Sequence, residues 1–455
     1  MAAQPLHINQ LPDDLLLRIL TEALSDSQNA RWDIGEIESA PRRDAALVYR
    51  RWAALCNAAP VVASLTVYIG PTAAFLARVR AFCCWLVRHG AGKVQHLRLA
   101  LQPHETWQPG QPQPPVLSAE AALELSKVLA AALPNCAGSL RQLELAVIDR
   151  NDCMFPMGVW VAMMGIHLRR LVLDIRHLHV AVSLEALPGL QDLELHNYAT
   201  LEPQCRLPPS LTRLRLVADG ALEALPNQVT ALTSLVDLEC RHYDGYLESG
   251  YEALTALSGS LRRLTLDGCA TAPNCLSCLT ALESLSLLST IGVGTNSDDC
   301  APLRAALPHL SRLTHLEFLM EHPFPDADDQ AAFACVPQLV SLRYCVLYPD
   351  APPLSGVWLA PLRILAAPLS AVAASLPALS STASQLAELE VQSDYLDDSA
   401  ALLPAVAEWA VQHTSLRRLV LLHGSHQFDP ALQARLLHVQ ARRPSLTVSF
   451  AREEA

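Results

Sequence analysis

The stretch LRRLTL at residues 261–266 contains the pattern that decides the fold. Leu264 and Leu266 alternate with Arg263 and Thr265, which predicts a short strand with one buried face and one open face. The same block of leucine, two variable residues, leucine, one variable residue and an apolar residue returns along the chain. It begins near Val62, Val94, Leu140, Leu168, Leu190, Leu211, Leu235, Leu261, Leu282, Leu313, Leu339, Leu362, Leu386, Leu416 and Leu446.

The spacing of these blocks indicates a repeat array, because Leu168 and Leu190 are 22 residues apart and Leu261 and Leu282 are 21 apart. A period of roughly 20–29 residues built on this block resembles the leucine-rich-repeat family, from Val62 to about Phe450. The resemblance implies an α/β solenoid with a curved parallel sheet on the concave face and helices and turns on the convex face. We therefore predict a solenoid over 61–450, with about fifteen degenerate repeats and a solvated Pro/Gln-rich loop at 102–115.

The polar positions between the strand leucines are the candidate partner-binding residues, since in such a solenoid they face the concave side. They include charges of both signs: Glu144, Arg170, Glu194, Arg213, Arg215, Asp237, Glu239, Arg263, Glu317 and Arg343. One interpretation is a partner groove with a charged centre. The other is an ordinary solvated face, on which opposite charges pair across neighbouring strands.

The first sixty residues differ from the repeats and predict a small helical unit over 8–60. The run from Leu11 to Leu20 begins with Leu-Pro-Asp-Asp, which places proline at the first helical position and carboxylates in the first turn. A second helix is expected over 44–56, before Pro60.

Two segments of this region resemble an F-box: Leu-Pro-Asp-Asp-Leu from Leu11, and Val-Tyr-Arg-Arg-Trp from Val48. Their spacing is longer than is usual in that family, because of an apparent polar insertion at 25–41. The resemblance implies docking on a Skp-family adaptor, which links to cullin and RING subunits of a ubiquitin ligase. The implied adaptor-binding residues are Leu11, Pro12, Leu15, Leu16, Ile19, Leu20, Leu47, Val48 and Trp52.

This resemblance implies a non-catalytic substrate receptor of an SCF-type ubiquitin ligase, with an unknown target protein held by the repeats. The alternative is a stand-alone repeat scaffold or inhibitor whose N-terminal helices only cover the open end of the solenoid, because the first repeat of such an array needs a cap.

Bulk composition argues against several other classes of partner. The net charge of −12 argues against nucleic acid or an anionic membrane as the main partner. The longest apolar stretch, from Trp358 to Leu379, contains Arg363 and three prolines, so no membrane segment is predicted. No secretory signal is seen, and the odd count of 13 cysteines then favours reduced thiols in the cytoplasm or nucleus.

The sequence predicts no cofactor, no metal and no catalytic residue. Cys275 and Cys278, with Cys269 and Cys300 nearby, have part of a zinc spacing, but buried thiols are the favoured interpretation. No His-Glu-x-x-His or Gly-x-Ser-x-Gly motif occurs among the residues.

Overall fold

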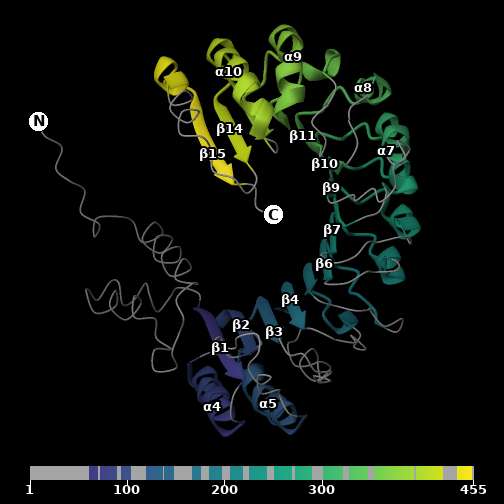
Figure 1. Ribbon diagram of the computed structural model, residues 1–455. Coiled ribbons are helices and arrows are strands. Elements are labelled where there is room, and N and C mark those ends of the chain that lie inside the picture. Colours follow the sequence, from purple (N-terminus) through teal and green to yellow (C-terminus); the bar gives the residue numbers. More distant parts are fainter. Residues whose placement is uncertain are drawn as a thin grey trace, which may run out of the picture. The chain divides into compact units, whose positions relative to one another are not determined.

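The computed structural model describes most of the repeat region of the 455-residue chain (Figure 1). The described residues are 61–69, 72–89, 94–103, 119–136, 138–147, 167–175, 184–196, 205–218, 225–242, 251–268, 272–288, 301–320, 327–346, 353–393, 396–423 and 438–452. The chain divides into an N-terminal unit, Met1–Leu211, and a C-terminal unit, Thr212–Ala455. The predicted helical unit at 8–60, with all nine adaptor-binding residues, lies outside the described residues.

The N-terminal unit contains a parallel sheet whose described strands pair in the order of the sequence. Its strands are β1 (Val61–Ile69), β2 (Val94–Pro103), β3 (Gln142–Val147), β4 (Arg170–Ile175) and β5 (Asp192–His196). The returns between strands are α4 (Thr72–His89), α5 (Ala119–Ala132), the 3-10 helix η4 (Leu133–Asn135) that continues α5, and the 3-10 helix η6 (Leu184–Ala186). Parallel neighbours require such a return after every strand.

The C-terminal unit repeats the same arrangement (Figure 1). Its described strands are β6 (Arg213–Ala218), β7 (Asp237–His242), β8 (Arg263–Asp267), β9 (Ser284–Leu288), β10 (His315–Met320), β11 (Ser341–Val346), β12 (Ile364–Pro368), β13 (Glu388–Ser393), β14 (Arg418–His423) and β15 (Thr447–Arg452). They follow one another as hydrogen-bonded parallel neighbours.

The described returns of the C-terminal unit lie together on one side of its sheet, and no described helix covers the other face, which we call the open face (Figure 1). The described returns between β6 and β9 are short 3-10 helices: η7 (Asn227–Ala231), η8 (Tyr251–Leu257) and η9 (Asn274–Cys278). Then come α7 (Ala301–Ala306), η11 (Leu307–His309), α8 (Ala327–Phe333), η12 (Val357–Leu359), α9 (Leu369–Thr382) and α10 (Leu396–Gln412). The apolar stretch from Trp358 to Leu379 is thus divided among η12, β12 and α9, and among the described residues no helix is long and apolar enough to cross a membrane.

The core of each unit is a ladder of inward leucines, as the alternating pattern predicts. In the N-terminal unit Leu143, Leu171 and Leu193 stand in register, and all three are buried. In the C-terminal unit Leu238 and Leu264 continue the same arrangement. Burial of a leucine side chain contributes roughly 1.5–3 kcal/mol, so the ladder is the main source of stability. The predicted leucine-rich-repeat fold is confirmed by this stacking.

A serine directly before the first leucine of several blocks ties one repeat to the previous one. The hydroxyl groups of Ser139, Ser210 and Ser415 donate hydrogen bonds to the carbonyls of Val94, Leu190 and Leu386, at 2.9, 2.7 and 2.8 Å respectively. Each carbonyl belongs to the residue that opens the preceding block. Each of these bonds gives a donor to a backbone carbonyl that lies between two repeats and would otherwise lack one.

One boundary differs from the prediction. The Pro/Gln-rich loop was expected to begin at residue 102, but Gln102 and Pro103 close strand β2, opposite Tyr68 and Ile69 of β1. The nine-residue β1 provides partners along this whole length, and a proline is tolerated at the end of a strand. The rest of the predicted loop lies outside the described residues.

Candidate interaction surface

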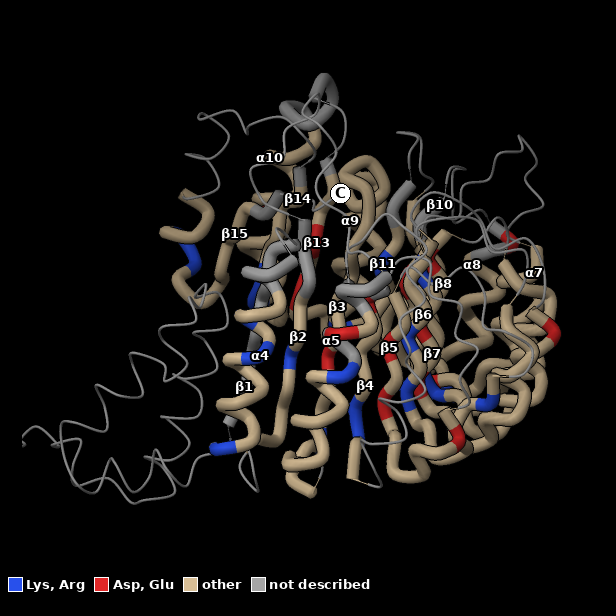
Figure 2. Tube along the Cα trace, turned by 90° about the horizontal axis from the view of Figure 1, so that it is seen from below, with Lys and Arg blue, Asp and Glu red and all other residues tan. Residues whose placement is uncertain are grey.

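The open face of the sheet carries the charged residues that the sequence singles out. In the C-terminal unit Arg215, Glu239, Thr265, Ser286, Glu317 and Arg343 form one continuous row in strand register. A second row lies two residues earlier on the strands and contains Arg213, Asp237 and Arg263. Acidic and basic residues therefore alternate over β6, β7 and β8 (Figure 2).

Glu144 of β3 is the centre of a polar cluster in the N-terminal unit. Its carboxylate lies 3.1 Å from Nε2 of His96 and 3.5 Å from Nε of Arg98, and it accepts a 2.8 Å hydrogen bond from Gln142. The contact with His96 is the largest of the effects that lower the pKa of Glu144, although partial burial opposes it. The carboxylate of Glu144 is therefore ionised near neutral pH and is paired with side chains of its own unit.

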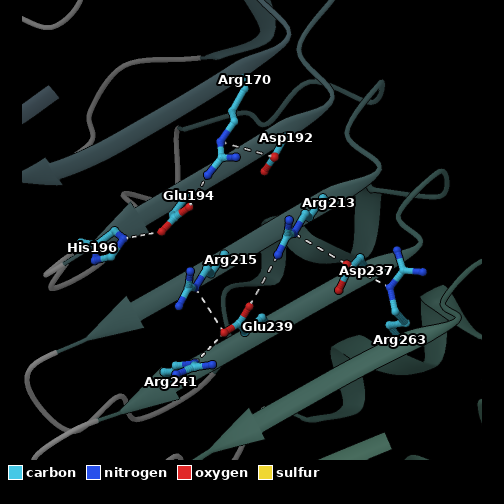
Figure 3. A network of polar contacts seen from close by, with 10 residues as sticks. All are labelled: Arg170, Asp192, Glu194, His196, Arg213, Arg215, Asp237, Glu239, Arg241 and Arg263. Atoms are coloured by element: carbon cyan, nitrogen blue, oxygen red, sulfur yellow. Dashed lines mark hydrogen bonds and ion pairs between the residues drawn. The ribbon is translucent and has the colours of Figure 1, made fainter. Parts of the chain in front are cut away.

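A second cluster of the N-terminal unit joins β4 and β5 (Figure 3). Arg170 contacts the carboxylates of Asp192 at 3.6 Å and Glu194 at 3.1 Å, and Glu194 contacts His196 at 2.6 Å. Glu194 is buried although it belongs to the open face. A buried carboxylate needs such partners, because desolvation of an isolated charge is costly.

In the C-terminal unit, Asp237 of β7 lies between two arginines on the neighbouring strands (Figure 3). Its carboxylate is 3.6 Å from Nε of Arg213 and 3.1 Å from Nε of Arg263. Only 18% of the Asp237 side chain is exposed, against 44% of Arg213 and 56% of Arg263. The guanidinium groups are thus the more exposed partners.

Glu239, two residues further along β7, is surrounded by three guanidinium groups (Figure 3). It lies 4.0 Å from Arg213, 3.2 Å from Arg215 and 2.5 Å from Arg241. Arg213 contacts both Asp237 and Glu239, so the contacts form one network over β6, β7 and β8. We call Arg213, Arg215, Arg241 and Arg263 the arginine cluster.

Later strands carry smaller polar pairs. Ser286 donates a 2.5 Å hydrogen bond to Glu317, Arg343 pairs with Glu390, and Arg418 contacts Glu388 at 3.0 Å. Burial raises the pKa of Glu390, while the Arg343 guanidinium opposes this rise. Each ion pair here balances one positive against one negative charge.

All ten candidate partner-binding residues lie on strands of the sheet, and each one contacts another residue of the same unit. Pairing between neighbouring strands, one of the two interpretations, is therefore present. These networks also contain residues outside the candidate list, such as His96 and Gln142 beside Glu144. Two others are His196 and Arg241. Each stands two residues after a candidate on its strand, so extending the alternation by one position would have found them.

The partial zinc spacing forms no cluster among the residues that the structure describes. There, no group of three His, Cys, Asp or Glu side chains is placed to hold a metal ion. The Cys275 thiol donates a hydrogen bond to the carbonyl of Tyr251 at 3.0 Å, and burial raises the pKa of this thiol to about 11. Cys278 is exposed and Cys275 is only partly buried, so the interpretation of this pair as buried thiols is wrong, whereas Cys240 is a buried core residue. Cys269 and Cys300 lie outside the described residues.

No model of a protein family matches the chain, and no curated protein matches it in sequence. Similar solved structures include an internalin of Listeria monocytogenes, with 15% identity, a TM-score of 0.31 and coverage of 71% of this chain and 83% of the internalin. A protein of Bacteroides fragilis shares 12% identity, with a TM-score of 0.23 and coverage of 80% and 68%. Likenesses this weak do not decide a family, and the repeat architecture rests on the strand ladder itself.

Proposed function

We propose that the chain is a protein-binding repeat scaffold that serves as the substrate receptor of an SCF-type ubiquitin ligase. The observation that supports partner binding is the open sheet face, where polar side chains from successive strands stand side by side while the returns occupy the other side. A surface whose side chains are already paired with one another can hold a partner with little further ordering, which lowers the entropic cost of binding.

The receptor role is supported by the F-box-like segments at 11–20 and 48–52. The apolar stripe of Leu15, Leu16 and Ile19 would dock on a Skp-family adaptor, and the repeats would hold the target protein. The receptor performs no chemistry in this scheme. Its contribution is proximity, because target lysines and the ubiquitin-carrying enzyme are brought into one complex.

The test is a pull-down of the full chain with a purified Skp-family adaptor. Wild type is compared with the double variant Leu15→Asp, Ile19→Asp, which places charges in the proposed contact. Thr21→Asp, directly after the run from Leu11 to Leu20 and outside the apolar stripe, is the control. Circular dichroism reports whether each variant retains the repeat fold.

Binding by wild type and by Thr21→Asp, with loss in the folded double variant, is the expected result. If the wild-type chain binds no adaptor, the ligase role is wrong and the chain is a stand-alone scaffold. Equal binding by all three proteins would show that Leu15 and Ile19 do not contribute to the adaptor contact.

A further inference from the structure

We propose that Glu390 of β13 is a proton-operated switch on the open face: when its carboxylate takes up a proton, Arg343 of β11 leaves it and pairs with Glu317 of β10. This inference rests on the proposed function, since it specifies how pH changes the surface that we propose for a partner. It concerns the C-terminal unit alone. The switch itself involves only this chain, so it is tested without a partner.

Glu390 has apolar neighbours on both adjacent strands. In strand register it stands between Ala366 of β12 and Val420 of β14, and both of these side chains are buried. Only 9% of the Glu390 side chain is exposed. Because these neighbours offer no hydrogen bond and keep water away, the charged carboxylate loses solvation, and this loss favours the protonated form.

A second carboxyl group lies beside Glu390 on the same strand. Glu388 stands two residues earlier, so both side chains belong to the open face of β13. Burial is the largest effect that raises the pKa of Glu390; a hydrogen bond with Glu388 and the charge of Glu388 add to the rise, and the Arg343 guanidinium opposes it. Two ionised carboxylates have no donor between them, so this hydrogen bond requires one proton.

Arg343 pairs with Glu390 from two strands away. The residue between them in register is Ala366, whose small side chain leaves room for the ion pair. On its other side Arg343 has Glu317 of β10 as its direct register partner, one strand spacing away, about 5 Å. Glu317 accepts a 2.5 Å hydrogen bond from Ser286 while Arg343 is paired with Glu390. A second carboxylate is therefore in reach when Glu390 becomes neutral.

The other charged groups near Glu390 already have partners or stand further away. Arg418 of β14 lies beside Glu388 in register and contacts its carboxylate at 3.0 Å. The described strand β12 contains no ionisable residue. On β10, His315 is exposed and contacts Thr314 at 2.8 Å, three strands away from Glu390. The ion pair with Arg343 is thus the contact that protonation of Glu390 removes.

The direction of the pH dependence follows from these contacts. The pKa of Glu390 is raised, chiefly by burial, so the folded chain holds this proton more tightly than the unfolded chain. The contribution of the proton to stability is present at low pH and is lost as the pH rises through the folded-state pKa. Above that pH the charged carboxylate retains Arg343, and below it Arg343 pairs with Glu317.

The experiment follows the Nε–H signal of Arg343 by heteronuclear NMR of the full chain, from about pH 5 to about pH 8. The signal is identified by its loss in Arg343→Lys, and circular dichroism reports the fold at each pH. The test variant is Glu390→Gln, which represents the protonated state at every pH because it carries no charge. The matched control is Glu283→Gln, with the same charge change in a glutamate that pairs with Arg262, directly before β9.

In the wild type the Arg343 signal is expected to move with one midpoint, above the ordinary glutamate pKa of 4.5. In Glu390→Gln it should stay at the wild-type low-pH position, and this difference from wild type near pH 8 is measurable even if acid unfolds the chain. Glu283→Gln should titrate as the wild type does. Glu388→Gln should shift the midpoint to lower pH, since it removes a neighbour that favours the protonated form. Adding Glu317→Gln to Glu390→Gln should move the signal again, because the second partner is lost.

A wild-type signal that does not move, titration of Glu390→Gln as in the wild type, or an unchanged midpoint in Glu388→Gln would each overturn the inference. So would a Glu390→Gln signal that is unaffected by the further Glu317→Gln change, because Arg343 would then have no second partner. All of these results are independent of the adaptor pull-down, which tests the proposed function separately.

Discussion

Gly356 shows how a single residue can be required by local geometry. Its φ of +123° lies in the region that side chains rarely adopt, and it directly precedes η12. A Cβ at this position would stand 2.8 Å from Cδ1 of Trp358. Trp358 is buried, and its ring centroid lies 5.0 Å from that of Phe333. Its indole N–H donates a 2.8 Å hydrogen bond to the carbonyl of Ser355. The glycine therefore allows the turn and the tryptophan to occupy the same small space.

Replacement of Gly356 by alanine is expected to destabilise the protein by about 1–3 kcal/mol, through backbone strain and the clash with Trp358. Urea unfolding measured by tryptophan fluorescence gives the change. Gly259→Ala is the control, since nothing lies within 4 Å of its added Cβ, and this variant should unfold at nearly the wild-type midpoint. Equal urea midpoints for the wild type and both variants would show that an alanine at position 356 causes no strain.

At the scale of the element, each strand has two faces with different energetic roles. Leu264 and Leu266 of β8 are buried, whereas Thr265 between them is half-buried on the open face. Alternation within five residues is enough to give both faces, because successive side chains of a strand point in opposite directions. The inward side supplies stability, and the outward side is the surface that we propose for a partner.

Leu264→Ala should therefore lower the free energy of unfolding by about 2–5 kcal/mol, because it leaves a cavity in a packed ladder. Thr265→Ala, the adjacent change on the open face, is expected to cost less than about 1 kcal/mol. Thermal unfolding followed by circular dichroism compares the two. A larger loss for Thr265→Ala would show that the face assignment of β8 is wrong.

Hydrogen bonds from side chains also hold elements that the repeat pattern does not address. Arg443 donates hydrogen bonds to the carbonyls of Ala410, His413, Thr414 and Leu416, at the end of α10 and in the turn after it. The last carbonyls of a helix have no partner within the helix, and a positive charge there also suits the helix dipole. This single side chain therefore ties the last described repeat to the one before it.

At the scale of the whole molecule, stability is distributed along each unit as contacts between sequential strands. β14, for example, pairs with β13 and with β15. In such arrays the energy is roughly a sum of repeat terms and nearest-neighbour terms. Damage to one repeat should then remain local, so the rest of the open face can keep its structure when a distant repeat opens.

Leu421→Ala, in the core of β14, is expected to speed amide hydrogen exchange in β13, β14 and β15 while β7, β8 and β9 keep their wild-type protection. Mass spectrometry of peptic fragments measures this. Leu422→Ala, at the adjacent and more exposed position, should change none of these segments appreciably. Faster exchange spread evenly over the C-terminal unit would mean that it unfolds as one cooperative block.

The positions of the strands could be read from the sequence, because period-two alternation and the leucine spacing are local properties. The described strands β1–β15 begin within two residues of the positions expected for them. The open-face rows followed as well, since equivalent positions of stacked repeats align in register. Serines before the first leucine were not recognised, although their recurrence in the sequence was a usable signal.

The sequence by itself determined the repeat, the buried leucine ladder and the identity of the open face, because each depends on the order of apolar and polar residues over a few positions. Only the tertiary structure decided which charges meet. Arg213 contacts Asp237 and Glu239, which lie 24 and 26 residues away, and Glu194 and Glu390 are buried on the open face. Long side chains reach several neighbours on adjacent strands, so their pairing depends on three-dimensional packing, which strand periodicity does not encode.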